Sequence, residues 1–189
     1  EKWMIRSHAD EIISKSCEKS KLGSITTGGS TGKPLKVYKS KHVHYEVLGW
    51  RALDWWGVSP ADNEAILHRR VPSTFMQKLR NRMMWWPTKR AYLSATAISE
   101  EDISRFLSDV IKNKIVWMVG YCASLEYVAD YVLRNNLKID GIKLIWSTSS
   151  PLTKIVRQKI ERAFHCKVMD QYGCCERDAC KCKSGKNCK

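Results

Sequence analysis

A glycine-rich loop near the start of the chain holds the residue types that phosphate binding requires. Glycine lets a backbone approach a ligand closely, hydroxyl and backbone N–H groups donate to phosphate oxygens, and lysine adds a positive charge. The loop is not a Walker loop, because Pro34 follows Lys33 where that motif has Ser or Thr. We interpret it as a nucleotide site, formed by Thr27, Gly28, Gly29, Ser30, Thr31, Gly32 and Lys33.

A strand, rather than the helix of a Walker loop, is expected directly after this loop. Residues 35–38 alternate apolar and polar side chains, which is typical of a strand. The loop is therefore interpreted as a turn between two strands that lies over phosphates.

Most of the remaining chain alternates short apolar runs with helical patterns. This alternation favours an α/β fold, with a mostly parallel doubly wound sheet and flanking helices. A basic, Trp- and Met-rich insert broken by Pro72 and Pro87 interrupts the alternation at residues 71–96. Strands are expected at 65–67, 114–119, 142–146 and 167–169, and helices at 9–20, 42–55, from 99 onward, at 124–135 and at 153–164.

Three polar segments each follow one of these expected strands. They are Gly120-Tyr121, residues 147–150 and residues 171–173. Ligands of doubly wound sheets bind beyond the carboxyl ends of the strands. We therefore expect the three segments to converge on one pocket.

The glycine loop and residues 170–176, Asp-Gln-Tyr-Gly-Cys-Cys-Glu, together resemble the adenylate-forming (AMP-binding) superfamily. That family has a Ser/Thr/Gly-rich loop ending in Gly-Lys-Pro and, later, a Tyr-Gly-x-Thr-Glu motif. The chain is more similar still to the phenylacetate-CoA ligase branch, which includes the CapK-type proteins of capsular polysaccharide biosynthesis. The motifs of that branch are the Thr-Gly-Gly-Ser-Thr-Gly loop, Gly120-Tyr121 with Ser124-Leu125-Glu126, and residues 149–153 before a charged helix.

This resemblance implies that residues 1–189 are a partial ATP/AMP-binding core. It would form part of the large N-terminal domain of an adenylate-forming enzyme and lack the C-terminal domain. The implied activity is ATP-dependent activation of a carboxylate to an acyl-adenylate, followed by transfer to CoA or another nucleophile. The implied cofactors are ATP and Mg²⁺, and the expected location is the cytoplasm.

The resemblance also assigns roles to individual residues. Glu176 would bind Mg²⁺ and act in catalysis with Lys33, and Tyr172 would stack on adenine. Cys175 stands where the family has a Thr that donates to the α-phosphate, and a thiol is a weaker donor. Further nucleotide contacts are expected from Ser149, Ser150, Pro151, Asp170 and Gly173, and contacts with the acyl substrate from Tyr121, Cys122 and Ser124.

The last residues, 174–189, are rich in cysteine. Four thiolates can hold zinc, so Cys175, Cys180, Cys182 and Cys188 are candidate ligands. Their spacing differs from paired Cys-x₂-Cys knuckles. Free thiols in a tail are the alternative.

Charge and hydropathy set further expectations about partners. The net charge is +14, which attracts polyanions, but no nucleic-acid motif is present and nucleic acid ranks third among the partners considered. Without a run of eighteen apolar residues, no membrane partner is expected. A non-catalytic nucleotide-binding or interaction module is the alternative to a ligase, favoured by Cys175. The Trp55-Trp56 and Trp85-Trp86 pairs are expected in the core or around an aromatic acyl pocket, and His42, His44 and His68 are treated as ordinary.

Overall fold

The computed structural model describes residues 2–15, 17–26, 35–40, 46–173 and 178–181. The chain divides into two compact units. The first comprises residues 1–47 and 173–178, and the second comprises residues 48–172 and 179–189.

The first unit contains an antiparallel strand pair that brackets the glycine loop. Strand β1 (Leu22–Thr26) pairs with β2 (Lys36–Ser40) in a register that places Thr26 opposite Lys36. The expected strand after the loop is therefore confirmed, while residues 27–34 of the loop itself lie outside the described residues. Short helical segments precede the pair, namely α1 (Lys2–Ser7), α2 (Ala9–Ile12) and η1 (Lys19–Lys21).

The expected helix at 9–20 is wrong in its length, since α2 ends at Ile12. The spacing of Ile12, Ile13 and Cys17 suggests an amphipathic helix, yet Ile12 is exposed. A short helix in water is marginal unless an apolar face packs against other elements. Apolar periodicity alone therefore overestimates this helix.

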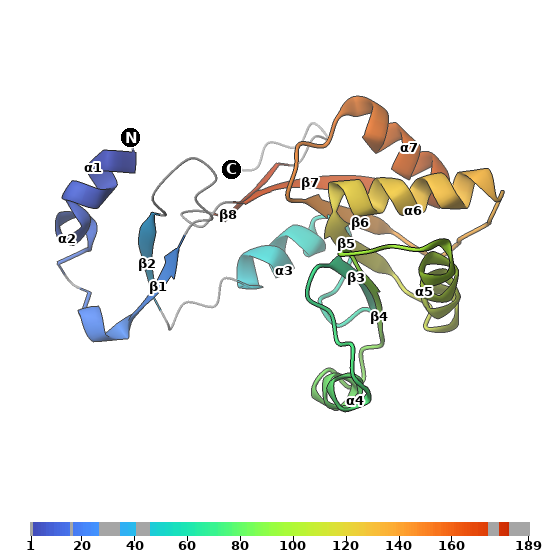
Figure 1. The fold of residues 1–189 in the computed structure, drawn as a ribbon, viewed down its shortest axis with the longest axis horizontal. Coiled ribbons are helices and arrows are strands. Elements are labelled where there is room, and N and C mark those ends of the chain that lie inside the picture. Colours follow the sequence, from blue (N-terminus) through green and yellow to red (C-terminus); the bar gives the residue numbers. More distant parts are fainter. Residues whose placement is uncertain (1, 16, 27–34, 41–45, 174–177, 182–189) are drawn as a thin grey trace. The chain divides into compact units, whose positions relative to one another are not determined.

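The second unit is built on a sheet with the strand order β4-β3-β5-β6-β7-β8 (Figure 1). Adjacent strands from β4 to β7 pair in parallel. This confirms the α/β fold with a mostly parallel sheet. The strands are β3 (Glu64–His68), β4 (Arg90–Ser94), β5 (Trp117–Tyr121), β6 (Leu144–Thr148), β7 (Lys167–Gly173) and β8 (Asp178–Lys181).

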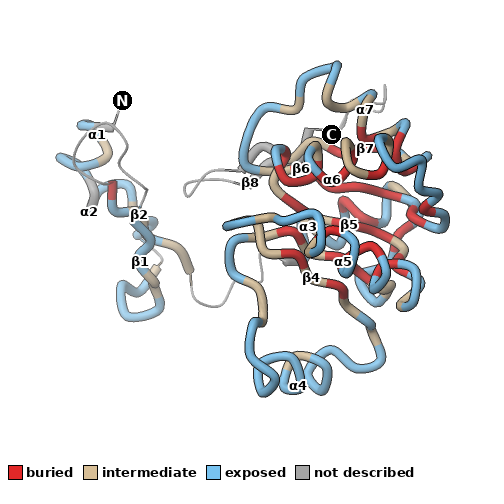
Figure 2. Tube along the Cα trace, turned by 45° about the vertical axis from the view of Figure 1, so that its right-hand side comes forward, coloured by how far each residue is buried: buried red, intermediate tan, exposed pale blue. Residues whose placement is uncertain are grey.

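Helices cover both faces of this sheet. Successive side chains along a strand point to opposite faces, so neighbouring strand residues join different cores. Ile145 joins a buried core with α5 (Glu100–Lys112), α6 (Cys122–Arg134) and α7 (Lys154–Phe164). Trp146 joins a second core with residues of α3 (Glu46–Asp54). Figure 2 shows the burial concentrated in the sheet and in the inner sides of these helices.

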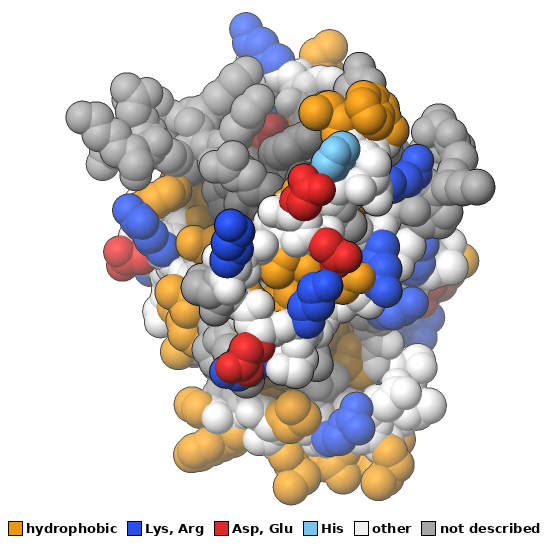
Figure 3. Space-filling model, turned by 90° about the vertical axis from the view of Figure 1, so that its left-hand side faces the viewer, with side chains coloured by type: hydrophobic (Ala, Val, Ile, Leu, Met, Phe, Trp, Pro, Cys, Tyr) orange, Lys and Arg blue, Asp and Glu red, His pale blue; other side chains and the backbone are white. Residues whose placement is uncertain are grey.

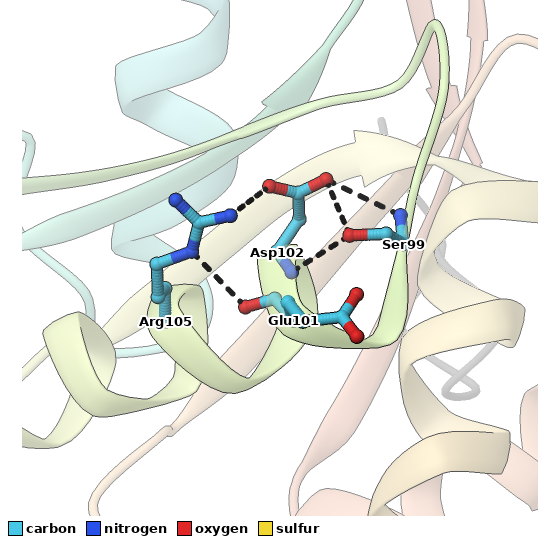
Figure 4. Close-up of polar contacts among 4 residues, drawn as sticks. All are labelled: Ser99, Glu101, Asp102 and Arg105. Carbon is cyan, nitrogen blue, oxygen red and sulfur yellow. Dashed lines mark hydrogen bonds and ion pairs between the residues drawn. The ribbon is translucent and has the colours of Figure 1, made fainter.

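The start of α5 shows how the sequence fixes a helix boundary (Figure 4). The Ser99 hydroxyl accepts from the Asp102 N–H at 3.1 Å and donates to the Asp102 carboxylate at 2.8 Å. Arg105 Nη2 donates to the same carboxylate at 2.9 Å. Hydrogen bonds from the Ser99 hydroxyl and backbone hold the pKa of Asp102 below its usual value. The result is a capping box, with acidic residues placed favourably at the positive end of the helix.

The insert expected at 71–96 is more regular than its prolines suggest. It contains α4 (Phe75–Met84), which begins at a capping box between Thr74 and Gln77, and the whole of β4. Pro72 precedes α4 and Pro87 lies between α4 and β4, so neither proline breaks a helix. Within the described residues, no helix is long and apolar enough to cross a membrane.

Candidate functional site

The carboxyl ends of four neighbouring strands meet at one edge of the sheet. His68 ends β3, Tyr121 ends β5 and Thr148 ends β6. The register of β5 and β6 places Tyr121 beside Thr148, and that of β6 and β7 places Ser147 beside Asp170. The strands extend further than expected, through Tyr121, Thr148 and Gly173, so the predicted segments form or directly follow the strand ends. These ends lie at the same edge, as parallel pairing requires.

Gly120 allows β3, β5 and α6 to approach closely at this edge. A Cβ atom at Gly120 would lie 2.7 Å from Leu67 Cβ and 3.2 Å from Leu125 Cγ. Contacts that short do not occur in unstrained packing, so only glycine fits there without a shift of the neighbours. Tyr121 follows immediately, so this close packing helps to set its position.

Cys122 links the start of α6 to the turn that follows β6. Its side chain is buried at the first position of α6 and its Sγ donates to Pro151 O at 4.0 Å. Burial raises the pKa of the Cys122 thiol. The thiol is therefore protonated at neutral pH and fixes α6 against residues 147–151.

Ser124 and Tyr121 occupy different environments although both are candidate acyl contacts. Ser124 is buried in the first turn of α6, and Tyr121 is half-buried. The N-cap residue of α6, Tyr121, makes no side-chain hydrogen bond to the first N–H groups of the helix. Those N–H groups carry the positive end of the helix dipole, which favours a negatively charged group nearby.

His68 is a site residue that sequence analysis treated as ordinary. Its ring stacks on Tyr121 with centroids 4.8 Å apart and planes 9° from parallel. Burial lowers the pKa of His68, so the ring is neutral at neutral pH. Among the described residues, its buried Nε2 has no hydrogen-bond partner. The available signal was its place directly after a buried strand, the same signal that identified Tyr121.

The segment from Ser147 to Pro151 turns sharply beyond β6. Ser147 is fully buried, whereas Ser149 and Ser150 are exposed. Ser149 has a φ of 83°, in the left-handed region that glycine adopts without strain and other residues rarely occupy. The turn thus holds two serine side chains out toward solvent at the strand edge.

Asp170 and Gln171 extend from β7 on opposite faces. Asp170 is half-buried beside Ser147, and Gln171 Oε1 accepts from Trp146 Nε1 at 2.8 Å. That bond joins Gln171 to the α3 side of the sheet and leaves Asp170 as the carboxylate at the edge. Tyr172 and Gly173 are the last two residues of β7, and only their backbone is described.

Several predicted site residues lie outside the described residues. They comprise the loop residues Thr27, Gly28, Gly29, Ser30, Thr31, Gly32 and Lys33, together with Cys175, Glu176, Cys182 and Cys188. Cys180 lies in β8, where only its backbone is described. Within the described part of the chain, no three His, Cys, Asp or Glu side chains group as a metal site. The magnesium and zinc assignments both depend on residues beyond that part and stay predictions.

Comparison with known proteins supports the resemblance. The chain is 28% identical over 181 residues to Protein CapK of Staphylococcus aureus, covering 91% of this chain and 39% of CapK. The chain thus spans 39% of the length of that relative. No protein-family model matches the chain.

Solved structures show which fold the chain has. An open conformation of 2-hydroxyisobutyryl-CoA ligase, in complex with 2-HIB-AMP and CoA, matches with a TM-score of 0.51 and 16% identity over 89% of this chain and 38% of that one. VinN matches with a TM-score of 0.53 and 13% identity, over 91% and 41% of the two chains. The N-terminal domain of FACL13 from Mycobacterium tuberculosis gives 0.51 and 12%, over 88% and 40%. The chain therefore shares its fold with a part of each of these structures.

Proposed function

We propose that this chain is the nucleotide-binding core of an enzyme that activates a carboxylate with ATP. In the proposed reaction a carboxylate oxygen attacks the α-phosphorus, a P–O bond forms, and the bond to pyrophosphate breaks. The acyl group of the resulting acyl-adenylate then passes to CoA or another nucleophile. The observation that carries the proposal is the fold, together with similarity to CapK along 91% of the chain.

The strand edge fits the acyl-adenylate in its chemistry. The buried His68 Nε2 without a partner, the Asp170 carboxylate and the exposed serines offer polar groups beside the Tyr121 ring. Asp170 would accept from the adenine amino group, and the Tyr172 ring would stack on the base. Tyr121, Cys122 and Ser124 would lie toward the acyl end, with Ser149, Ser150, Pro151 and Gly173 along the nucleotide.

The phosphates are assigned to the glycine loop. Its hydroxyl and N–H donors and Lys33 would offset the charge that develops on the phosphates, which is the usual source of rate in nucleotidyl transfer. Glu176 would hold Mg²⁺, since this cation prefers oxygen ligands. The metal would supply further positive charge to the same oxygens.

A non-catalytic nucleotide-binding module is the second candidate. Cys175 favours it, because a thiol donates weakly where the family has a threonine hydroxyl. The two candidates share nucleotide binding and differ in whether adenylate forms.

Two measurements separate these candidates. Calorimetry with ATP and Mg²⁺ measures binding, and exchange of labelled pyrophosphate into ATP measures adenylate formation with a panel of carboxylates that includes phenylacetate. Both use the 189-residue chain and the full product of its reading frame. Exchange that depends on one carboxylate supports the ligase, binding without exchange in either protein supports the module, and absence of nucleotide binding in both overturns the two together.

A further inference from the structure

Helix α4 exposes an apolar surface that the proposed function does not use. Phe75, Met76, Met83 and Trp86 are 77%, 70%, 72% and 80% exposed. Figure 2 shows α4 exposed along most of its length, in contrast with α6. Figure 3 shows hydrophobic side chains gathered at the lower edge, where α4 lies in Figure 1. The Trp85-Trp86 pair was expected in the core or around an acyl pocket, and its exposure shows that the core expectation is wrong.

Four of the apolar residues of α4 share one side of the helix, while Met84 lies on another side. Phe75, Leu79 and Met83 follow one another at intervals of four, and Met76 lies seven residues before Met83. In a helix of 3.6 residues per turn such positions form a single stripe. Trp85 and Trp86 follow at the carboxyl end.

Basic residues border this stripe on both sides. Each residue turns the helix by about 100°. Lys78 and Arg82, four residues apart, therefore lie on one side of the stripe, and Arg80 lies on the other side. Long basic side chains can place their charge at a polar boundary while their methylenes lie along apolar material. The helix therefore has an apolar stripe with two cations on one side and one on the other.

The charge of the whole connection has one sign. Residues 69–90 contain no Asp or Glu. Within the described part of the chain, no carboxylate forms an ion pair with Arg69, Arg70 or the basic residues of α4. This surface is thus complementary to a negatively charged partner.

The helix is anchored to the sheet at its carboxyl end. Arg90 forms an ion pair with buried Glu64 and places its guanidinium 3.6 Å from the centroid of the Trp85 ring. Thr88 Oγ1 donates to Ala61 O at 3.0 Å, and the Lys89 N–H donates to Asn63 Oδ1 at 2.8 Å. Together with the capping box at Thr74, these contacts present the stripe on a fixed support.

We propose that α4 is a peripheral membrane-binding helix that docks on an anionic lipid surface. Its apolar side chains enter the boundary between headgroups and acyl chains, and its cations bind headgroup phosphates. Tryptophan at the end of the helix suits the same boundary. Exposed Met and Phe side chains favour lipid over nucleic acid, since a nucleic-acid surface is read by cations and stacking rings. This inference concerns a surface helix, is independent of the proposed catalytic function and involves no membrane-spanning segment.

Vesicle flotation of the 189-residue chain tests the proposal. Vesicles of phosphatidylcholine with one third phosphatidylglycerol are compared with pure phosphatidylcholine. The charge variant Lys78→Gln/Arg80→Gln/Arg82→Gln is compared with Lys112→Gln/Lys143→Gln/Lys167→Gln, which removes the same charge from exposed positions elsewhere. The apolar variant Phe75→Ser/Met83→Ser is compared with Ile111→Ser/Ile155→Ser, which are exposed on α5 and α7.

The wild type is expected to float with the anionic vesicles and not with the neutral ones. The α4 charge variant should bind about 100-fold more weakly, because each basic residue near an anionic surface contributes roughly a fivefold gain. The α4 apolar variant should also lose binding, and both control variants should keep most of it. Thermal melts followed by circular dichroism verify that each variant is folded.

Three outcomes would overturn the proposal. One is no flotation of the folded wild type. Another is equal loss in the α4 charge variant and its control, which would mean that net charge alone acts. The third is binding to RNA or duplex DNA, or dimerisation in light scattering, that depends on α4 while the vesicles do not bind, since α4 would then have a different occupant.

Discussion

At the scale of single residues, the strand edge combines groups whose burial decides their chemistry. The His68 ring is neutral because burial disfavours its charged form, and the Cys122 thiol stays protonated for the same reason. Neither side chain therefore carries charge at neutral pH. Asp170 supplies a carboxylate at this edge. The Tyr121 ring and the serines of the turn form the surface around it.

The lowered pKa of His68 predicts how stability depends on pH. Because the unfolded chain has the higher His68 pKa, it binds more protons than the folded chain as the pH falls below about 6.5. The stabilising contribution of neutral His68 is present above that pH, declines as the pH falls, and levels off below the folded pKa. Urea unfolding from pH 7.5 to 5 should show a shallower decline for His68→Gln than for the wild type or for His8→Gln, an exposed control.

Ser149 predicts a difference between two substitutions at one position. Its φ of 83° suits glycine and disfavours a β-branched residue. We expect Ser149→Val to be less stable than Ser149→Gly by about 1–2 kcal/mol, the cost of the left-handed conformation for a side chain with a Cβ. Equal midpoints of urea unfolding for the two variants would contradict the strained turn.

Replacing Lys33 is expected to weaken the binding of ATP but not that of AMP. If it contacts the outer phosphates, Lys33→Ala weakens ATP binding by about 1.5–3 kcal/mol, the usual value for a hydrogen bond to a charged group. AMP binding should change little, because AMP has neither outer phosphate. Calorimetry measures both affinities, and equal losses for ATP and AMP would remove Lys33 from the phosphate assignment.

At the scale of elements, the start of α5 is a helix boundary that the sequence predicts. Ser99 and the acidic residues after it marked the start of α5, and the structure confirms the cap that they form. Thr74 and Gln77 form the same kind of cap at the start of α4, but the nearby prolines led to the expectation of an irregular insert there. Cap chemistry is local, so it can be read from a few residues, whereas the length of α2 depended on packing that no local pattern contains.

The cap of α5 predicts a measurable loss of stability. Ser99→Ala removes the acceptor of the Asp102 N–H and should lower the free energy of unfolding by about 1 kcal/mol. Ser104→Ala, at an exposed position within the same helix, should leave stability unchanged or raise it slightly, since alanine has the higher helix propensity. Denaturation of the two variants side by side isolates the cap from a general effect of removing serine.

The candidate site was predictable where strands determine it. Tyr121 and Asp170 follow from strand order, because parallel strands carry their last residues to a shared edge. The stacking of His68 on Tyr121 was not predictable, since it depends on β3 lying next to β5 although β4 comes between them in sequence. The roles of Lys33 and Glu176 rest on motif resemblance alone and await the binding measurements.

At the scale of the whole molecule, the two units differ in how much apolar core they contain. Within the described residues of the first unit, Leu35 is the single buried side chain, whereas the second unit has buried cores on both faces of its sheet. An isolated strand pair has marginal stability in water. We expect backbone amides of β1 and β2 to exchange with deuterium faster than those of β5 and β6, measured by mass spectrometry. Equal protection would mean that the first unit is stabilised by more than its described residues show.

The strand order also explains why α4 has so much exposed surface. From β3 the chain moves one strand outward to β4, and every later step, through β5 and β6 to β7, runs in the opposite direction across the sheet. Crossover connections between parallel strands are almost always right-handed, so a connection that runs the other way is directed to the other face. The connection that carries α4 is thereby kept out of the layer formed by α5, α6 and α7. Its apolar stripe is left without those helices as neighbours by the handedness of the fold, whatever the residues of the stripe are.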